Sequence, residues 1–432
     1  MQSNNRIHIA VATLFSLGAG GAMAAEAETA SVPSAYSAVP NSSNVLSGNA
    51  FESSGIPIAK TRTPHPLRIA DGVDLFADAE FDAGYDSNVK QSSRGNEVGS
   101  LLFRIRPTIS AQAAYRADRY VLSYLGDYVR YPSYDPNSLG QNDLILGAQN
   151  VFTGRAGLAW QLSAGDHYDP IGSTDRTNNG TVADHYRTYA ANTTFRYGAE
   201  EATGRVELDA GIGSKRYLND RINTESADVD NMNLGARFYY KIAPKTRLLT
   251  EVRRTTFDYK HDTRLLQNTD MRYLLGASWD ATAVLAGSAK VGLQAKNYVH
   301  DEVNPDYKGL SWEAALRWKP LTYSSFDLIS GRAASDPSGS SSGVPITKNL
   351  SLAWNHDWMD YVHSKLSAGR QRTRYTISGR KDVDDVYSAS IMYDMRRWLG
   401  LGAEFTFSHR NSNDDTLDYI RRQTIVKIQA SF

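Results

Sequence analysis

From Asp71 to the C-terminus, the sequence repeats one pattern, in which apolar and polar residues alternate along short segments. Between Val206 and Ile212, for example, every second residue is apolar and the residues between them are acidic or glycine. Successive side chains of a β-strand point to opposite faces, so a period of two predicts strands with one apolar and one polar face. The pattern recurs in about 18 segments, which predicts an all-β fold for this part of the chain.

Each predicted strand is long enough for the roughly 9–11 residues of a tilted membrane crossing. The predicted strands are residues 72–86, 99–116, 119–131, 143–153, 155–166, 185–198, 203–215, 230–243, 246–259, 269–281, 284–299, 308–319, 324–334, 347–357, 361–376, 384–395, 398–409 and 417–432. The connections alternate between short ones, such as 243–245, and long polar ones, such as 215–230. Tight turns on one rim and long loops on the other are typical of a transmembrane barrel, whereas a Greek-key sandwich gives no reason for them.

The predicted fold is therefore a transmembrane antiparallel β-barrel of about 18 strands over residues 71–432, with both ends on the short-turn rim. In a soluble barrel of this size, inward apolar residues would have to fill a lumen that is too wide for them. In lipid, a closed barrel with its apolar face outward pairs every backbone group, so the polar face must line water. Tyr and Trp near the strand ends, such as Trp279 and Trp398, fit interfacial girdles.

Composition excludes several classes of protein. Lys and Arg total 47, as do Asp and Glu, so the charge balance does not indicate a nucleic-acid partner. The absence of cysteine excludes disulfide scaffolds, thiolate metal sites and cysteine nucleophiles. After the N-terminal region, no apolar run approaches the roughly 18 residues of a membrane helix, so a helical membrane protein is excluded.

The N-terminal residues predict export. Residues 1–24 have the features of a signal peptide, because Arg6 and His8 precede an apolar run and Ala22-Met23-Ala24 supplies a small-x-small cleavage site. Residues 25–70 are rich in Ala, Ser, Asn and Pro, which predicts a flexible periplasmic segment. A short plug helix or strand within this segment is the alternative.

The last predicted strand, 417–432, ends on Phe432. It resembles the closing strand of bacterial outer-membrane barrels, in which the terminal aromatic residue belongs to the assembly signal. The resemblance implies a location in the Gram-negative outer membrane, with outer-membrane lipid and lipopolysaccharide around the barrel. It also implies contact with the barrel assembly machinery through this strand.

The polar faces carry many charged residues of both signs, so no simple ion selectivity follows. They are either cross-strand ion pairs that keep the wall polar and rigid, or a charged track that guides a polar or ionic substrate. The candidate lumen-lining residues are Asp74, Asp78, Glu80, Asp82, Asp86, Arg104, Arg106, Arg205, Glu207, Asp209, Arg237, Arg317, Glu404, Arg421 and Lys427. Pairing of the first and last strands would place Arg421 and Lys427 beside the acidic row of residues 74–86.

Residues that would indicate catalysis are scattered. The nine histidines lie on different predicted loops and strands, and no nucleophile elbow, zinc-protease motif or phosphate-binding glycine loop occurs. The Asp-rich stretches 382–385 and 411–415 lack the spacing of an EF-hand loop. We therefore predict no enzyme activity, no cofactor and no metal site.

The stretch Gly84-Tyr85-Asp86-Ser87-Asn88, at the end of the first predicted strand, resembles a family of outer-membrane barrels (beta-barrel porin 2-like) associated with exopolysaccharide synthesis operons. The resemblance covers about residues 70–432 and includes the plan of amphipathic hairpins and the aromatic end. It implies export of exopolysaccharide or capsule, with the polysaccharide and periplasmic export components as partners. For Asp86, Ser87 and Asn88, a turn and loop cap is the alternative to a sugar contact.

Three functions remain open from the sequence. The first is passage of an exopolysaccharide chain across the outer membrane. The second is a general or substrate-selective porin for small solutes. The third, least favoured, is an outer-membrane hydrolase.

Overall fold

The computed structural model describes residues 67–173, 180–279, 284–337 and 343–431. Within them, strands β2 to β19 form a closed antiparallel barrel of 18 strands, as predicted from the sequence. The signal peptide 1–24, most of the segment 25–70 and Phe432 lie outside the described residues, so the predictions for them stay predictions.

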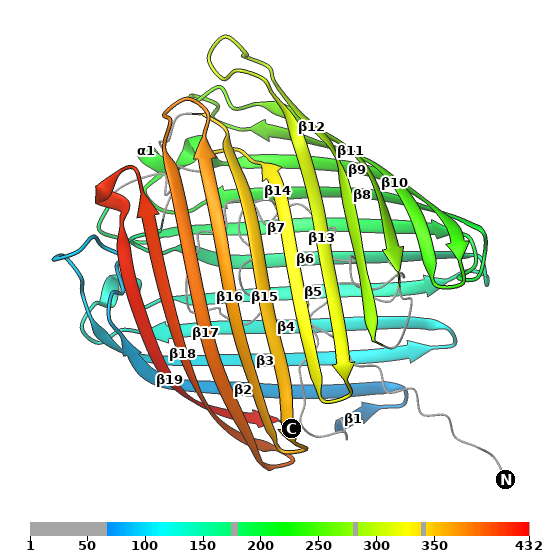
Figure 1. The fold of residues 1–432 in the computed structure, drawn as a ribbon, viewed down its shortest axis with the longest axis horizontal. Helices are drawn as coiled ribbons and strands as arrows, with labels where there is room; N and C mark the ends of the chain where they lie inside the picture. Colours follow the sequence, from blue (N-terminus) through cyan, green and yellow to red (C-terminus); the bar gives the residue numbers. More distant parts are fainter. Residues whose placement is uncertain (1–66, 174–179, 280–283, 338–342, 432) are drawn as a thin grey trace.

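The strands follow one another around the wall in chain order (Figure 1). Their bounds are β1 (Leu67–Ala70), β2 (Val73–Asp86), β3 (Ser100–Tyr115), β4 (Asp118–Arg130), β5 (Gly140–Val151), β6 (Ala156–Asp169), β7 (Asp184–Tyr197), β8 (Gly204–Tyr217), β9 (Val229–Ala243), β10 (Thr246–Tyr259), β11 (Asn268–Trp279), β12 (Leu285–Tyr298), β13 (Tyr307–Leu321), β14 (Ser324–Ala334), β15 (Pro345–Met359), β16 (Val362–Tyr375), β17 (Lys381–Arg396), β18 (Leu399–Ser412) and β19 (Tyr419–Ser431). The one α-helix of the described residues, α1 (Arg221–Thr224), lies in a loop, as do the 3-10 turns η2 (Asp135–Asn137), η3 (Glu225–Ala227) and η4 (Asp415–Leu417).

Each wall strand corresponds to one predicted strand, with ends that differ by at most three residues. The sequence predicts that the four residues of β1 belong to the flexible segment 25–70. In the structure they form a strand. β1 pairs with the start of β2, from Ala70↔Val73 to Leu67↔Leu75. β3 pairs with the other edge of β2 along its whole length, so β1 shares one edge of β2 with β19.

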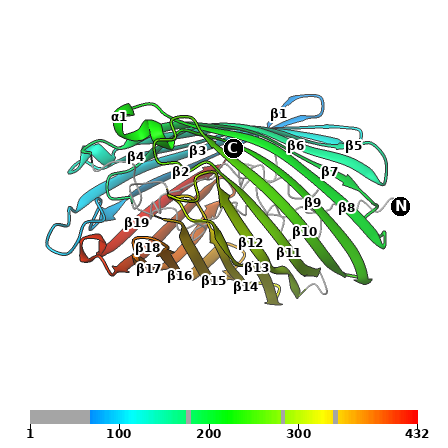
Figure 2. The same ribbon diagram turned by 90° about the horizontal axis from the view of Figure 1, so that it is seen from above.

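The barrel closes where β19 pairs with β2, from Gln423↔Asp86 to Ser431↔Asp78. We call this pairing the seam. Figure 1 shows the red β19 beside the blue β2, and Figure 2 shows the strands curving around a common interior. The seam therefore brings the two ends of the described chain together in the wall.

The connections separate the barrel into a short-turn rim and a long-loop rim, as the sequence predicted. Fully described turns of the short-turn rim are 116–117, 152–155, 198–203, 244–245, 322–323, 360–361 and 397–398. Fully described loops of the long-loop rim are 87–99, 131–139, 218–228, 260–267, 299–306, 376–380 and 413–418. Because neighbouring strands are antiparallel, successive connections lie on opposite rims.

The two faces of the wall differ in the way that the alternation predicts. Outward residues include many exposed apolar side chains, such as Phe103, Leu208 and Val426. The inward positions between them are mostly polar, and several are almost fully buried, such as Arg205 and Glu207. In the part of the chain that the structure describes, no helix is long and apolar enough to cross a membrane.

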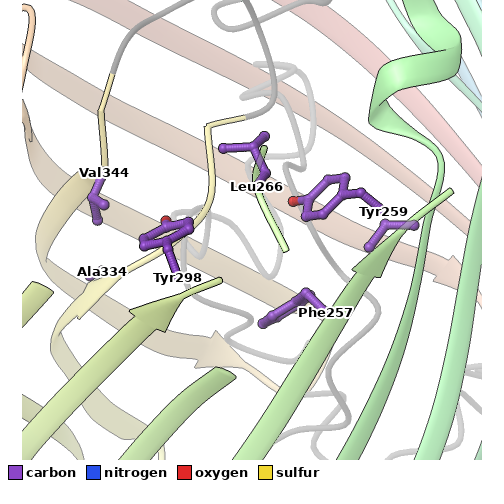
Figure 3. Packing of buried hydrophobic residues seen from close by; sticks show 7 residues of the cluster. Phe257, Tyr259, Leu266, Tyr298, Ala334 and Val344 are labelled. Carbon is purple, nitrogen blue, oxygen red and sulfur yellow. The ribbon is translucent and has the colours of Figure 1, made fainter. Parts of the chain in front are cut away.

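One group of inward apolar residues departs from this rule. Phe257, Tyr259 and Tyr298 end their strands at the long-loop rim and pack with Leu266, Ala334 and neighbouring residues (Figure 3). The strand ends and loops there bury an apolar cluster inside the barrel. A two-residue alternation alone does not predict this, because the cluster draws on loop residues as well.

Candidate functional site

The inner wall at the seam holds the acidic row of β2. Asp86, fully buried, accepts hydrogen bonds from Nε and Nη2 of Arg421 at 3.0 and 2.5 Å. The side-chain amide of Gln423 donates to the same carboxylate at 3.0 Å. Further along β2, Asp78 accepts a hydrogen bond from the Ser431 hydroxyl at 2.6 Å.

Two cations lie along the middle of the acidic row. Arg106 on β3 donates to Glu80 and, at 3.1 Å, to Asp82. Lys427 on β19 lies 3.2 Å from Glu80 and 2.8 Å from Glu404 of β18. The first and last strands are therefore joined by ion pairs as well as by the backbone ladder.

The remaining candidates of this region have other partners. Asp74 pairs with Arg68 of β1 at 3.3 Å. Arg104 forms a two-pronged contact with Asp127 of β4, which the sequence did not single out. Asp127 occupies an inward position of the alternation, and that is the only signal that could have found it.

The stretch Gly84–Asn88 ties the two terminal strands together at the long-loop rim. Ser87 exchanges two hydrogen bonds with the backbone of Arg422, at 2.8 and 2.9 Å. The buried Asn88 side chain donates to the Ile420 carbonyl at 3.1 Å. A Cβ on Gly84 would lie 2.2 Å from the Thr424 carbonyl oxygen, so only glycine permits this close approach. These contacts support the cap alternative for Asp86, Ser87 and Asn88 over a sugar contact.

A second group of inward charges covers β8 to β13, and we call it the charged lattice. Its ten members are Arg205, Glu207, Asp209, Arg237, Glu251, Arg253, Asp270, Arg272, Lys290 and Glu313. The five cations and five carboxylates balance. On β8 and β9, Arg237 lies 2.6 Å from Asp209 and 3.4 Å from Glu207, and Arg205 lies 3.3 Å from Glu207.

Glu313 is the centre of the lattice on β10 to β13. It contacts Lys290 at 2.5 Å, Arg253 at 3.2 Å and Arg272 at 3.5 Å. Glu251 also contacts Lys290, at 2.9 Å, and Arg253. The sequence did not single out Glu313 or Arg272, although both occupy inward positions of the alternation.

Arg317, the last of the predicted candidates, pairs with Asp327 of β14 at 2.6 Å. Beyond it the character of the wall changes. Among the inward positions of β15 to β18 is a group of neutral residues that we call the uncharged sector, whose members are Asn349, Ser351, Ser367, Gln371, Ser388, Ser390, Thr406 and Ser408. The inward charges Lys365 and Glu404, both opposite Ser390, border this sector. Neutral contacts join them, such as the 2.7 Å hydrogen bond between the hydroxyls of Ser367 and Ser388.

Three asparagines form an amide cluster on β7 to β9. Asn192 and Asn233 both pair with Gly211, one from each side. Asn231 and Asn233 are each 4% exposed, yet neither atom of the Asn231 amide nor Nδ2 of Asn233 has a hydrogen-bond partner among the described residues. Buried amides without protein partners are costly unless another molecule satisfies them.

Loops of the long-loop rim fold toward one another. The Asn137 side chain donates to the carbonyls of Val89 and Ile171, both at 3.0 Å, and so joins three loops. On another side, Asp336 accepts from Lys296 at 2.9 Å and from the Tyr298 hydroxyl at 2.9 Å. These contacts fix loop residues over the inner wall.

The described residues contain no group of three or more His, Cys, Asp or Glu that could hold a metal ion. Several of their histidines pair locally with a carboxylate, such as His185 with Asp166 at 2.5 Å. At the short-turn rim, a hydrogen bond from Lys241 lowers the pKa of the exposed Glu201 carboxyl.

Several solved structures match most of the chain, at low identity and with TM-scores below 0.5. OccK2 (OpdF) of Pseudomonas aeruginosa is 10% identical, with a TM-score of 0.46 and coverage of 84% of this chain and 98% of that one. OccAB3 of Acinetobacter baumannii is 10% identical, with a TM-score of 0.44 and coverage of 83% and 99%. The FrpB iron transporter of Neisseria meningitidis is 10% identical, with a TM-score of 0.43 and coverage of 84% and 83%.

A search of curated proteins found no match to the chain. A family model with the description "Putative beta-barrel porin 2" matches residues 75–432, which include β3 to β19 and all but the first two residues of β2. This match agrees with the all-β fold, the amphipathic hairpins and the polar interior. The chain therefore belongs to the beta-barrel porin 2 family.

Proposed function

We propose that the barrel spans the Gram-negative outer membrane and takes part in the export of exopolysaccharide or capsule through its interior. The observation that carries the proposal is the inner wall of the barrel, which is polar but internally neutralised. In the charged lattice, five cations face five carboxylates, and the uncharged sector presents hydroxyl and amide groups. Such a wall can form many weak hydrogen bonds with a sugar polymer without binding it tightly at any one place.

The amide cluster is the most specific support for a sugar substrate. Asn231 and Asn233 present buried donors and an acceptor that the described residues leave unsatisfied. Asn192 supplies a further free acceptor, its Oδ1 atom. Amide groups both donate and accept, as sugar hydroxyls do. Because these amide atoms are buried, we infer that the side chains turn toward the lumen when a sugar ring binds.

The periplasmic side of the proposed pathway requires partners. We propose that periplasmic polysaccharide export components deliver the polymer to the short-turn rim, and that the barrel assembly machinery recognises the terminal strand with Phe432. Both proposals follow from the proposed location and from the family resemblance.

A substrate-selective porin for small solutes is the second candidate. The observation that favours it is the joining of loops at the long-loop rim, where Asn137 links three loops and Asp336 holds Lys296. Loops fixed over the interior would narrow the path, which suits small solutes more than a polymer.

Deletion of the gene separates the two candidates. Export predicts loss of surface polysaccharide with normal uptake of small solutes. Full-length protein in a planar bilayer is the complementary measurement. High single-channel conductance without any polysaccharide phenotype would reject export and support a porin.

The amide cluster permits a sharper test. Asn231→Ala combined with Asn233→Ala should lower the amount of surface polysaccharide while the barrel still folds and inserts. Asn349→Ala, an amide of the uncharged sector, is the matched control and should have the smaller effect. Equal polysaccharide in all three strains would remove the amide cluster from the proposed pathway.

A further inference from the structure

The outward face of β15, β16 and β17 carries a concentration of positive charge next to the long-loop rim. Its five cations, which we call the basic patch, are Lys348, Arg370, Arg372, Arg374 and Lys381, and all five are exposed. The three arginines occupy alternate positions of β16, so they share the outer face of the strand. They lie at the end of β16 that enters loop 376–380, and therefore at one level of the wall.

The strand register places like charges directly opposite one another. Lys348 on β15 faces Arg372, and Lys381 on β17 faces Arg374. Like charges at directly opposite positions destabilise a sheet. Two such pairs side by side therefore call for a negatively charged group that the wall itself does not supply.

Within the described residues, one carboxylate lies among these cations. Asp385 of β17 accepts hydrogen bonds from Arg370 at 2.6 and 3.0 Å. The described residues provide no ion pair for Lys348, Arg372, Arg374 or Lys381. Four of the five cations thus point outward without a carboxylate partner in the described chain.

Outward cations elsewhere at the long-loop rim are arranged differently. Arg187 pairs with Asp166 at 2.8 Å, and Arg216 pairs with Asp230 at 2.5 Å. Lys260 contacts the same Asp230 at 2.8 Å. These three cations thus have the carboxylate partners that four members of the basic patch lack among the described residues.

Apolar side chains continue the same outer face toward the middle of the wall. Leu350, Leu352, Leu366 and Tyr387 are each about half exposed, at 45–53%. Leu350 is the direct partner of Arg370, so the apolar surface begins where the basic patch ends. This outer face therefore carries positive charge next to the long-loop rim and an apolar surface toward the middle of the wall.

We propose that the basic patch binds the phosphate groups of an anionic glycolipid of the outer leaflet, the lipid A part of lipopolysaccharide. This inference rests on the proposed outer-membrane location. The phosphates accept charge-assisted hydrogen bonds from the arginines and relieve the two like-charge pairs, and arginine suits such bidentate contacts. The acyl chains lie along the apolar surface that begins at Leu350.

The test uses full-length protein purified in a neutral detergent and titrated with diphosphoryl lipid A. Arg372→Gln combined with Arg374→Gln should weaken binding by roughly tenfold or more, as expected for the loss of charged hydrogen bonds. Arg396→Gln combined with Arg397→Gln is the matched control, because it removes two exposed arginines at the short-turn rim. The control should bind like the unmodified protein.

A second probe, lipid A without its phosphates, should bind weakly to all variants. The proposal would be overturned if the patch variant and the control variant bound diphosphoryl lipid A with equal affinity. It would also be overturned if lipid A without phosphates bound as tightly as lipid A with them. Heat-dependent gel mobility of each variant shows whether the barrel is folded. If the patch variant fails to fold, Lys348→Gln combined with Lys381→Gln provides the same comparison from the neighbouring strands.

Conductance in a phosphatidylcholine bilayer distinguishes this proposal from the proposed function. A patch variant that conducts normally but binds no lipid A supports the basic patch independently of the exported substrate. Normal lipid A binding by a barrel without any role in polysaccharide export would leave the patch intact and reject the export function.

Discussion

Two parts of the inner wall are both polar but are built from different side chains. The charged lattice of β8 to β13 fills its inward positions with long side chains of both signs, joined through Glu313 and Glu251. The uncharged sector of β15 to β18 fills them with small hydroxyl and amide groups, such as Ser351 and Ser367. Both satisfy the requirement for a polar interior, yet Arg205, Glu207 and Glu251 of the lattice are at most 4% exposed, whereas Ser351 and Ser367 are partly exposed.

The difference teaches that polarity and mobility are separate properties of such a wall. Each lattice cation is held by one or more carboxylates, so we expect this part of the wall to be rigid. Removal of one member would leave an unpaired, buried charge. In the uncharged sector, Thr406 and Ser408 are as buried as the lattice, whereas Ser351, Ser367 and Ser390 are partly exposed. We expect the lattice to carry structural stability and the uncharged sector to carry contact with a moving solute.

The strongest test of this contrast removes the centre of the lattice. Glu313→Ala leaves Lys290, Arg253 and Arg272 without a shared carboxylate and should destabilise the barrel by about 3 kcal/mol. Denaturant unfolding in detergent micelles, followed by tryptophan fluorescence, measures the change. Ser351→Ala is the control and should change the free energy of unfolding by less than about 0.5 kcal/mol. Equal effects of the two substitutions would contradict the contrast.

Added bulk tests whether the two regions differ in free space. Ala315, an inward residue of β13, is 6% exposed, so Ala315→Phe should cost about 2 kcal/mol through overpacking. Ser351→Phe should cost less than about 0.5 kcal/mol because the side chain can extend into the interior. The same unfolding assay compares the two variants. Single-channel conductance should fall for Ser351→Phe although its free energy of unfolding changes little. Strong destabilisation by Ser351→Phe would show that the uncharged sector is also filled.

The boundary between the regions provides an intermediate case. Arg317 and Asp327 form an ion pair that is 2.6 Å long, and both side chains are partly exposed. Asp327→Asn should therefore cost about 1 kcal/mol, less than the loss of Glu313. The amide can still bond to Asn355, which donates to Asp327 at 3.0 Å. A loss as large as that of Glu313→Ala would extend the lattice to β14.

The smallest expected effect lies within the uncharged sector. Ser367→Ala removes the 2.7 Å hydrogen bond to Ser388 and should cost about 0.5 kcal/mol. Ser390→Ala serves as the comparison, because the described residues provide no side-chain partner for its hydroxyl. If Ser367→Ala exceeds Asp327→Asn in cost, hydroxyl bonds stabilise this wall more than ion pairs do.

The fold could be predicted almost completely from the sequence, because one physical rule applies to every strand. Alternation identifies both faces of a strand without knowledge of its neighbours, and the unequal connections reveal the rims. The predicted and observed strand ends differ by up to three residues, because the backbone hydrogen bonds at a strand end depend on the partner strand. The sequence left a short strand within residues 25–70 only as an alternative, since the four residues of β1 are too few to show a period.

The contacts of the inner wall could not be predicted in the same way. Alternation placed Arg104 and Asp127 on inward positions, but their pairing depends on strand register, which the pattern does not contain. The same holds for Glu313, whose three cations come from β10, β11 and β12. Asp336 lies in a loop, where no periodicity exists to indicate its contact with Lys296.

The seam also has a consequence for the order in which the barrel forms. Every other neighbouring pair of wall strands is a hairpin, whereas Asp86 and Arg421 are 335 residues apart in the chain. Contacts of high sequence separation carry the largest chain-entropy cost, so we expect the hairpins to form first and the seam last. Opening the seam would expose two strand edges in lipid, which is costly. We therefore expect the buried Asp86–Arg421 pair to slow the opening of the seam and so to lengthen the lifetime of the closed barrel.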